Sequence, residues 1–255
     1  MKRLSTLALA TMLLTASVAS AQPPPPPGGG QRAGGPPPMT NLQIFPKDAP
    51  RETVLTTMQA FTSALGVQCN YCHVQEGRGG RNDMATDEKP TKKAARAMML
   101  LARDINAKLP EAIGKTADAT TRVGCATCHR GVAIPKQITD IMTEAGASGG
   151  PTAALAKFKD LRAQYYGGQS YDFSEGALIT MAQRANTASK YDDALAYLQA
   201  NLDYHPKSAR TYSAMAQMKN AKGDKAGAIA ALEKAVELDP NNGQAKAQLE
   251  TLKKQ

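Results

Sequence analysis

The chain has 255 residues, a formal charge of +9 at pH 7, four cysteines, three histidines and no tryptophan. This length accommodates two modest domains. Basic residues are not interleaved with aromatic ones, and no block of five or six like charges occurs, which argues against a nucleic-acid-binding protein. Lys2 and Arg3 precede an apolar run that ends in Ala19-Ser20-Ala21, the pattern of a cleavable secretory signal.

The regions of the chain differ sharply in composition. The N-terminal apolar run is too short to span a bilayer, so we expect cleavage near Ala21 and a mature protein that is periplasmic or otherwise exported, without a transmembrane segment. A Pro/Gly-rich stretch, QPPPPPGGGQRAGGPPPMT, cannot build a core and is expected to be a disordered tether. A second break, EAGASGGP, separates the cysteine-containing region from a helical tail. The expected divisions are a signal peptide (1–21), the tether (22–40), an N-terminal domain (41–143), a linker (144–151) and a C-terminal domain (152–255).

Two amphipathic helices are predicted in the N-terminal domain. The first is expected between Asp48, a candidate N-cap, and Gly66, a candidate C-cap. Its apolar face has the helical spacing i, i+4, i+7 and i+11, with Val54, Met58, Phe61 and Leu65. The second is expected from Pro90 to Leu109. Its apolar stripe consists of Met98, Leu101, Ile105 and Leu109. Strand-like alternation of useful length is missing, so the sequence predicts an all-α protein.

The tail contains an internal repeat. YDDALAYLQANLDYHP ends at Pro206, and KAGAIAALEKAVELDP ends at Pro240, 34 residues later. Paired helices with this period resemble the tetratricopeptide repeat. Two units are predicted, about 174–207 and 208–241, followed by a capping helix in GQAKAQLETLKK. Because such repeats need about three units to bury their faces, we expect a helix at 152–166 or the N-terminal domain to cover the open end.

All four cysteines lie in two copies of CxxCH: Cys69, Cys72 and His73 in the first, and Cys125, Cys128 and His129 in the second. Disulfides, a redox dithiol or half of a zinc site would use such cysteines, but none of these explains a histidine directly after the second cysteine. Covalent haem attachment does, because two thiols bind the vinyl groups of one haem and the next imidazole binds its iron. The sequence therefore predicts two covalently bound c-type haems, with the cysteines as attachment sites and the two histidines as proximal iron ligands. This domain is poor in aromatic residues, and the apolar haem macrocycles would take the place of the missing aromatic side chains in its interior.

The sixth iron ligand separates electron transfer from catalysis, because a methionine sulfur closes the iron and an open iron allows peroxide or oxygen chemistry. Met58 lies on the helix that leads into the first motif. Met98 lies on the helix before the second motif, and we prefer it to Met99 because it belongs to that helix's apolar stripe. Met84 is a reserve candidate. Ordinary core packing is the alternative role for each of these methionines.

The pattern NLQIFPKD…MQAFTSALGVQCNYCH…KPTKKAARAMMLLARDIN…GCATCHRGVAIP resembles the cytochrome c subunit family of photosynthetic reaction centres, over about residues 41–136. The resemblance implies axial methionines on the helices ahead of each motif, and electrons that move along a row of haems. It implies Met58 for the first motif and Met98 for the second. That subunit carries four haem motifs, whereas this chain has two followed by a repeat domain, so a role in photosynthesis does not follow.

We therefore expect a multihaem cytochrome c domain followed by a helical tetratricopeptide-like domain. The expected function is transfer of single electrons between redox partner proteins, with the repeats used for docking or structural support, rather than catalysis. A peroxidase-like dihaem enzyme with one open iron is an alternative, as is a repeat scaffold whose cysteines bind zinc. His205 is expected in a surface turn. Arg122 and Arg130 flank the second motif and could pair with haem propionates or face water.

Overall fold

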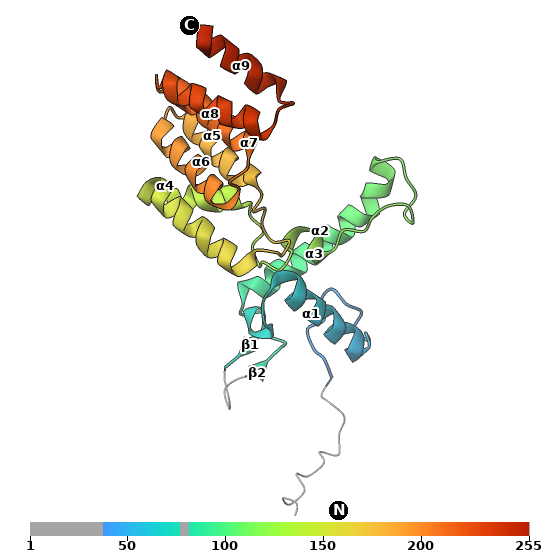
Figure 1. Cartoon of the computed structure of the whole chain (residues 1–255). Helices are drawn as coiled ribbons and strands as arrows, with labels where there is room; N and C mark the ends of the chain where they lie inside the picture. The colour runs from blue at the N-terminus through green and yellow to red at the C-terminus, as the bar shows by residue number, and fades with distance from the viewer. Residues whose placement is uncertain (1–37, 77–81, 255) are drawn as a thin grey trace, which may run out of the picture. The chain divides into compact units, whose positions relative to one another are not determined.

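The computed structural model describes residues 38–76 and 82–254 (Figure 1). The predicted signal peptide, its cleavage site and most of the predicted tether lie outside the described residues. Residues from Thr40 onward belong to one compact unit. The predicted all-α class is confirmed, because the described residues form nine α-helices, one 3₁₀ turn and one pair of two-residue antiparallel strands. In chain order these are α1 (Arg51–Leu65), η1 (Cys69–Tyr71), β1 (Val74–Gln75), β2 (Asn82–Asp83), α2 (Pro90–Ala112), α3 (Cys125–His129), α4 (Ile138–Tyr165), α5 (Glu175–Thr187), α6 (Tyr191–Tyr204), α7 (Ala209–Ala221), α8 (Lys225–Leu238) and α9 (Gly243–Lys254).

The ends of α1 differ in how well the sequence predicts them. Pro50 occupies the N-cap position, and no side chain caps the helix there, so the prediction of Asp48 as N-cap is wrong. A proline suits this position because its fixed φ is compatible with entry into a helix and it has no N–H to leave unpaired. Gly66 ends the helix with a φ of 65°, as predicted. This left-handed conformation is accessible to glycine without the steric cost that a Cβ imposes.

The helix α2 extends beyond its predicted end. It begins at Pro90, a favourable first helical position, and continues through Pro110 to Ala112. Its first turn carries Lys92, which is buried although the rest of the helix is largely exposed. The stripe predicted as apolar is present as a row of exposed side chains, with Met98 48%, Leu101 51% and Ile105 38% exposed.

The helix α4 consists of two helical segments on either side of Gly150, whose backbone is non-helical with φ 61° and ψ −155°. A Cβ at Gly146 would lie 3.4 Å from the Cβ of Ala154, so the two segments fold back against each other. The stretch predicted as a linker, 144–151, therefore includes helix up to Gly149, the break at Gly150, and Pro151 at the start of the second segment. The assignment of separate domains on its two sides stays a prediction.

The predicted 34-residue helical repeat is present in α5 to α8. The helix α5 begins at Glu175, and α7 begins 34 residues later at Ala209. In the same way, α6 begins at Tyr191 and α8 begins 34 residues later at Lys225. Small and branched residues at matching positions pack between the helices, and Ala194 and Ala228 are both 0% exposed. The predicted capping helix is α9.

Two hydrophobic clusters account for most of the buried apolar side chains. The first joins α4, α5 and α6 and includes Met142, Phe158, Leu178 and Leu198. The second joins α7, α8 and α9 around Leu232. The second segment of α4 and the helix α9 thus cover the two ends of the repeat, as expected for elements that would otherwise expose an apolar face.

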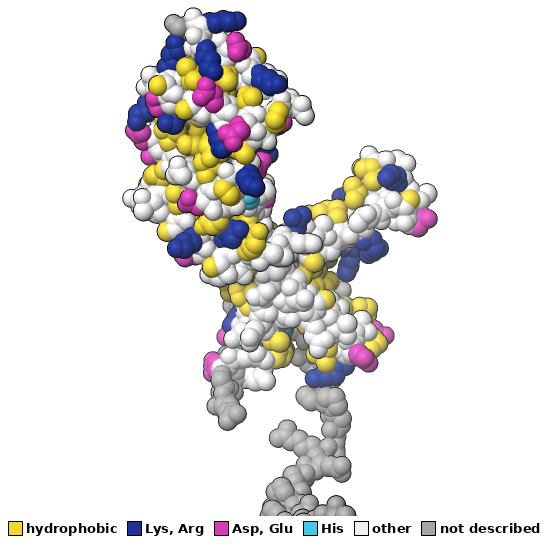
Figure 2. All heavy atoms as spheres, viewed as in Figure 1, with side chains coloured by type: hydrophobic (Ala, Val, Ile, Leu, Met, Phe, Trp, Pro, Cys, Tyr) yellow, Lys and Arg dark blue, Asp and Glu magenta, His cyan; other side chains and the backbone are white. Residues whose placement is uncertain are grey.

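The region from Asn41 to Lys136 has a much smaller core. Among its described residues (41–76 and 82–136), the buried apolar side chains are Val54, Ala64, Val74 and Val132, and none of them belongs to either cluster. Larger apolar side chains remain on the surface, and Figure 2 shows them on the visible face of α2. This region therefore has apolar surface available for a large hydrophobic ligand.

Candidate functional site

Both CxxCH strings lie in short helical turns. The first spans η1 and the residues that follow it, and the second forms α3. Residues three and four apart share a face of a helical turn, so the first cysteine of such a string lies on the same face as the second cysteine and the histidine, and all three can face one ligand together. All four cysteines are free thiols; Cys69 and Cys128 are exposed, whereas Cys72 and Cys125 are partly buried. Burial raises the pKa of the Cys72 thiol, partly offset by a hydrogen bond with Thr91.

Each of the two motif histidines contacts a backbone carbonyl through its Nδ1 atom. The distance from His73 Nδ1 to the Met84 oxygen is 2.9 Å, and that from His129 Nδ1 to the Val132 oxygen is 3.0 Å. A carbonyl oxygen can only accept, so Nδ1 carries the proton in both rings and the lone pair of Nε2 is left for a metal. Burial, with nearby Lys92, lowers the pKa of His73, which favours the neutral form that ligates. The sequence did not predict these carbonyl partners.

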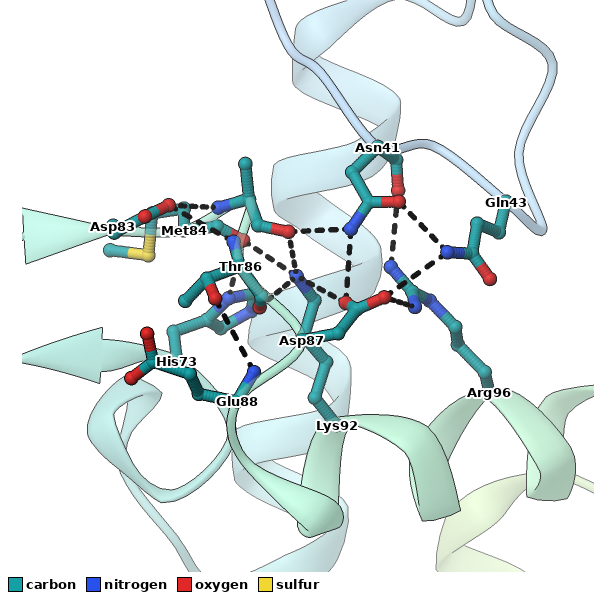
Figure 3. Close-up of polar contacts among 11 residues, drawn as sticks. Asn41, Gln43, His73, Asp83, Met84, Thr86, Asp87, Glu88, Lys92 and Arg96 are labelled. Carbon is teal, nitrogen blue, oxygen red and sulfur yellow. Dashed lines mark hydrogen bonds and ion pairs between the residues drawn. The ribbon is translucent and has the colours of Figure 1, made fainter.

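The loop before α2 surrounds the buried Lys92 with carbonyl groups. Its Nζ donates to the oxygens of Met84 at 2.9 Å, Ala85 at 2.8 Å and Thr86 at 2.8 Å. Figure 3 shows this ammonium group among the carbonyls, with His73 and Asp87 beside it. The Met84 oxygen therefore accepts from His73 and from Lys92 at once.

Asp87 connects this loop with the segment before α1. Its carboxylate pairs with Arg96 at 2.7 Å and Lys92 at 3.2 Å, and accepts hydrogen bonds from Asn41 at 3.0 Å and Gln43 at 3.1 Å. These donors, Arg96 first, hold the pKa of Asp87 well below its usual range. The Arg96 guanidinium also donates to the Asn41 carbonyl at 3.1 Å. The network fixes the loop that carries the hydrogen-bond partner of His73.

The segments that flank the two motifs touch at a pair of glycines. The Gly131 N–H donates to the Ala64 carbonyl at 2.8 Å, and a Cβ on Gly66 would lie only 2.1 Å from the Gly131 oxygen. Gly66 lies three residues before Cys69, and Gly131 lies two residues after His129. The end of α1 thus brings the first motif next to the loop that follows the second.

The second motif is also connected to α2 and to the loop before α5. Asn106 donates to the Val123 carbonyl at 2.8 Å and accepts from the Val123 N–H at 2.7 Å. Ser170 donates to the Arg130 carbonyl at 2.7 Å. These contacts fix the backbone on both sides of α3.

The candidate methionines occupy different environments. Met58 is partly buried on α1, which packs against α3. Met98 is exposed on the apolar stripe of α2, whereas Met99 is partly buried on a different face of the same helix. The Met84 side chain is 45% exposed, and only its carbonyl contacts His73. The assignment of Met58 and Met98 as iron ligands stays a prediction.

The remaining candidates from the sequence are His205, Arg122 and Arg130, which lie outside the two motifs. His205 follows α6, and its Nε2 lies 3.3 Å from the Phe173 carbonyl. Arg122 and Arg130 have exposed side chains. Among residues 38–76 and 82–254, no three His, Cys, Asp or Glu side chains are arranged to hold a metal ion.

The residues of each motif fit covalent attachment of a haem. Each motif supplies two thiols for thioether attachment and an imidazole whose Nε2 is available for iron. The apolar side chains exposed on α2 would suit the macrocycle.

A family comparison identifies the chain. The profile of the family described as photosynthetic reaction centre cytochrome C subunit matches residues 10–228. The chain belongs to this family. Membership implies a c-type cytochrome with covalently bound haem. The matched range extends beyond the resemblance in residues 41–136 and includes α4 to α7 of the helical tail.

Two curated relatives match parts of the chain. Cytochrome c-554 of Chloroflexus aurantiacus is 44% identical over 81 residues, which cover 30% of this chain and 17% of that protein. The photosynthetic reaction center cytochrome c subunit of Rubrivivax gelatinosus is 34% identical over 86 residues, which cover 31% of this chain and 22% of that protein. The matched segments therefore span about a fifth of the length of these relatives.

A solved structure, the first TPR of Spaghetti (RPAP3) bound to an HSP90 peptide, is similar with a TM-score of 0.33. Its sequence identity is 14%, and the match covers 46% of this chain and 88% of that chain. This similarity is too low to assign the helical tail to a known repeat family. Within residues 38–76 and 82–254, no helix has the length and apolar character needed to cross a membrane.

Proposed function

We propose that this protein is an exported dihaem c-type cytochrome that carries single electrons between redox partner proteins. The observation that carries the proposal is the matched arrangement of the two motif histidines. In both, the Nδ1–H of the imidazole donates to a backbone carbonyl, and the Nε2 lone pair is left for iron. Each of these histidines directly follows the second of two free cysteines. A structural disulfide or a thiol redox pair would not require this orientation of the imidazole.

Each motif would hold one haem with its own side chains. Cys69 and Cys72 would attach one macrocycle with His73 as proximal ligand, and the second motif would do the same with Cys125, Cys128 and His129. When bound, the haems supply reversible one-electron chemistry. The contact between Gly66 and Gly131 supports their use as a pair, because it fixes the flanks of the two motifs against each other.

Met58 and Met98 would supply the remaining protein ligand to each iron. Met58 lies on α1, which ends just before the first motif, and α2 is fixed to the second motif by the paired hydrogen bonds of Asn106 with Val123. We prefer Met98 to Met99 because it lies on an exposed apolar stripe with room for a ligand. Two closed irons favour electron transfer, whereas an open iron would support a peroxidase-like enzyme.

Export and partner binding complete the proposal. The apolar N-terminal run with its small-residue site favours export to the periplasm. Electron transfer requires a donor and an acceptor protein, and membership in the reaction-centre cytochrome family supports partners of this kind. The helical tail could dock one of them or stabilise the haem-binding region, since its first cluster includes α4, which directly follows the second motif.

Haem stoichiometry tests the proposal. The full chain is produced with a c-type haem maturation system, and intact mass under denaturing conditions counts the covalently bound haems. We expect two haems in the unchanged protein. The double variants C69A/C72A and C125A/C128A should each retain one. A chain that carries no haem after competent maturation, or only one, contradicts the proposal.

A further inference from the structure

The carbonyl partners of the two motif histidines are not equivalent. The Nδ1–H of His129 donates a hydrogen bond to the carbonyl oxygen of Val132, three residues later in the chain. The Nδ1–H of His73 donates to the backbone carbonyl oxygen of Met84, and this oxygen also accepts a hydrogen bond from the buried Lys92 at 2.9 Å. Among the hydrogen bonds of residues 38–76 and 82–254, no lysine donates to the Val132 carbonyl. The surroundings of the two motif histidines therefore differ by one buried cation, Lys92, next to the carbonyl partner of His73.

We propose that Lys92 is a positioning residue for His73 that acts through the shared Met84 carbonyl, and that it raises the reduction potential of the haem at Cys69 and Cys72. This inference rests on the proposed dihaem function.

A histidine ligand that donates Nδ1–H to a strong acceptor becomes a more basic ligand, and a more basic ligand favours oxidised iron. A carbonyl that already accepts a charge-assisted hydrogen bond from an ammonium group is a weaker acceptor for the imidazole. Lys92 therefore reduces the basicity that the Met84 carbonyl gives to His73, and this change favours the reduced state.

The charge of Lys92 acts in the same direction. Its Nζ and the Nδ1 of His73 lie within about 6 Å of each other, because each is 2.9 Å from one oxygen, and charges act strongly at this separation. Reduction adds one electron and no proton, so a fixed positive charge nearby favours it. The partner carboxylate of Lys92, Asp87, is shared with Arg96, so it neutralises neither cation completely.

The alternative is that Lys92 only stabilises the loop. It bonds three successive carbonyls, and its loss would weaken the fold around residues 84–86 even if the haem potential did not depend on it. The reduction potential separates the two roles, because a purely structural lysine would change the stability of the chain without shifting one of the two potentials selectively.

The experiment is a spectroelectrochemical titration of the full-length holoprotein. Haems are first counted by intact mass, and the potentials are then measured for the unchanged protein, Lys92→Met and the control Lys93→Met. Lys93 is the next residue in the chain and its side chain is exposed. Lys93→Met changes the net charge by the same amount as Lys92→Met, but at the surface. We expect Lys92→Met to lower the reduction equilibrium constant of one haem about tenfold, or about 59 mV for one electron, and Lys93→Met to have little effect. The C125A/C128A variant, which should keep only the first haem, assigns the affected potential.

A second variant keeps the test decisive if Lys92→Met loses haem. Asp87→Asn leaves Lys92 in place and removes a negative charge, so it should shift the same potential upward. Two haems with no selective shift in Lys92→Met, or no upward shift in Asp87→Asn when Lys92→Met loses haem, would overturn the inference and leave the dihaem proposal intact. Fewer than two haems in the unchanged protein would overturn both, and the mass measurement reveals this before any potential is recorded.

Discussion

The contact between Gly66 and Gly131 leads to a sharp prediction about stability. At Gly66 the backbone has a φ of 65°, and an added Cβ would lie 2.1 Å from the Gly131 oxygen and 2.9 Å from its carbonyl carbon. These neighbours are backbone atoms, which cannot rotate away as the end of a flexible side chain can. Gly66→Ala therefore requires the loop after the second motif to move away from the end of α1.

The expected loss has two parts. A left-handed conformation without glycine costs roughly 1–2 kcal/mol. Separation of the loops would also break the Gly131–Ala64 hydrogen bond of 2.8 Å, which contributes about 1 kcal/mol, and would cost some packing. The total should be about 2–4 kcal/mol, a large share of the roughly 5–15 kcal/mol that stabilises a typical domain.

Gly114 provides a matched control. Its φ is 64°, and a Cβ there would meet no heavy atom within 4 Å. Gly114→Ala should therefore lose only the conformational part, about 1–2 kcal/mol. Urea unfolding of the holoprotein, followed by circular dichroism, measures both variants. Equal losses in the two variants would refute the claim that the two loops are in close backbone contact.

Three further predictions concern charge, buried polarity and ligation. The folded-state pKa of Asp87 lies well below its unfolded value of about 3.9. The ionised carboxylate therefore contributes stability at a pH above that value, and the contribution is lost as the pH falls below it. The difference in unfolding free energy between the unchanged protein and Asp87→Asn should thus become smaller when the pH is lowered from about 6 to about 3. A difference that stays constant with pH would contradict this. Asn201 is 0% exposed and donates to the Glu175 carbonyl at 3.0 Å, so Asn201→Ala should cost about 2–3 kcal/mol in urea unfolding, and a loss below about 0.5 kcal/mol would show that this bond is dispensable. In the reduced protein, Met98→Ala should open one iron to carbon monoxide and Met99→Ala should not; the reverse spectral result would assign Met99 as the ligand.

The repeats and the helices could be predicted from the sequence because their signals are local. The matching 34-residue spacing of α5 with α7 and of α6 with α8 follows from periodic apolar positions, and the left-handed Gly66 marks the end of α1. The two CxxCH strings are equally local, because five consecutive residues hold the thiols and the imidazole of each motif. The family assignment from these strings and their flanks is confirmed.

The surroundings of the site could not be predicted because they depend on contacts between distant residues. The Met84 carbonyl lies 11 residues after His73, and Asn41 lies 46 residues before its hydrogen-bond partner Asp87. Lys92 resembles a solvated lysine at the start of a helix, yet three carbonyls and a carboxylate make its burial favourable. The cap predicted at Asp48 failed for a different reason, because Pro50 already provides a compatible start for α1.

The most direct test of the central claim, a dihaem electron carrier with closed irons, is carbon monoxide binding to the reduced full-length holoprotein. Visible spectra are recorded in the oxidised state, in the reduced state, and after addition of carbon monoxide. The account predicts two haems per chain, a methionine–iron charge-transfer band in the oxidised protein, and a reduced spectrum that carbon monoxide does not change. Binding of carbon monoxide to one haem of the unchanged protein would contradict it and favour the enzyme with one open iron.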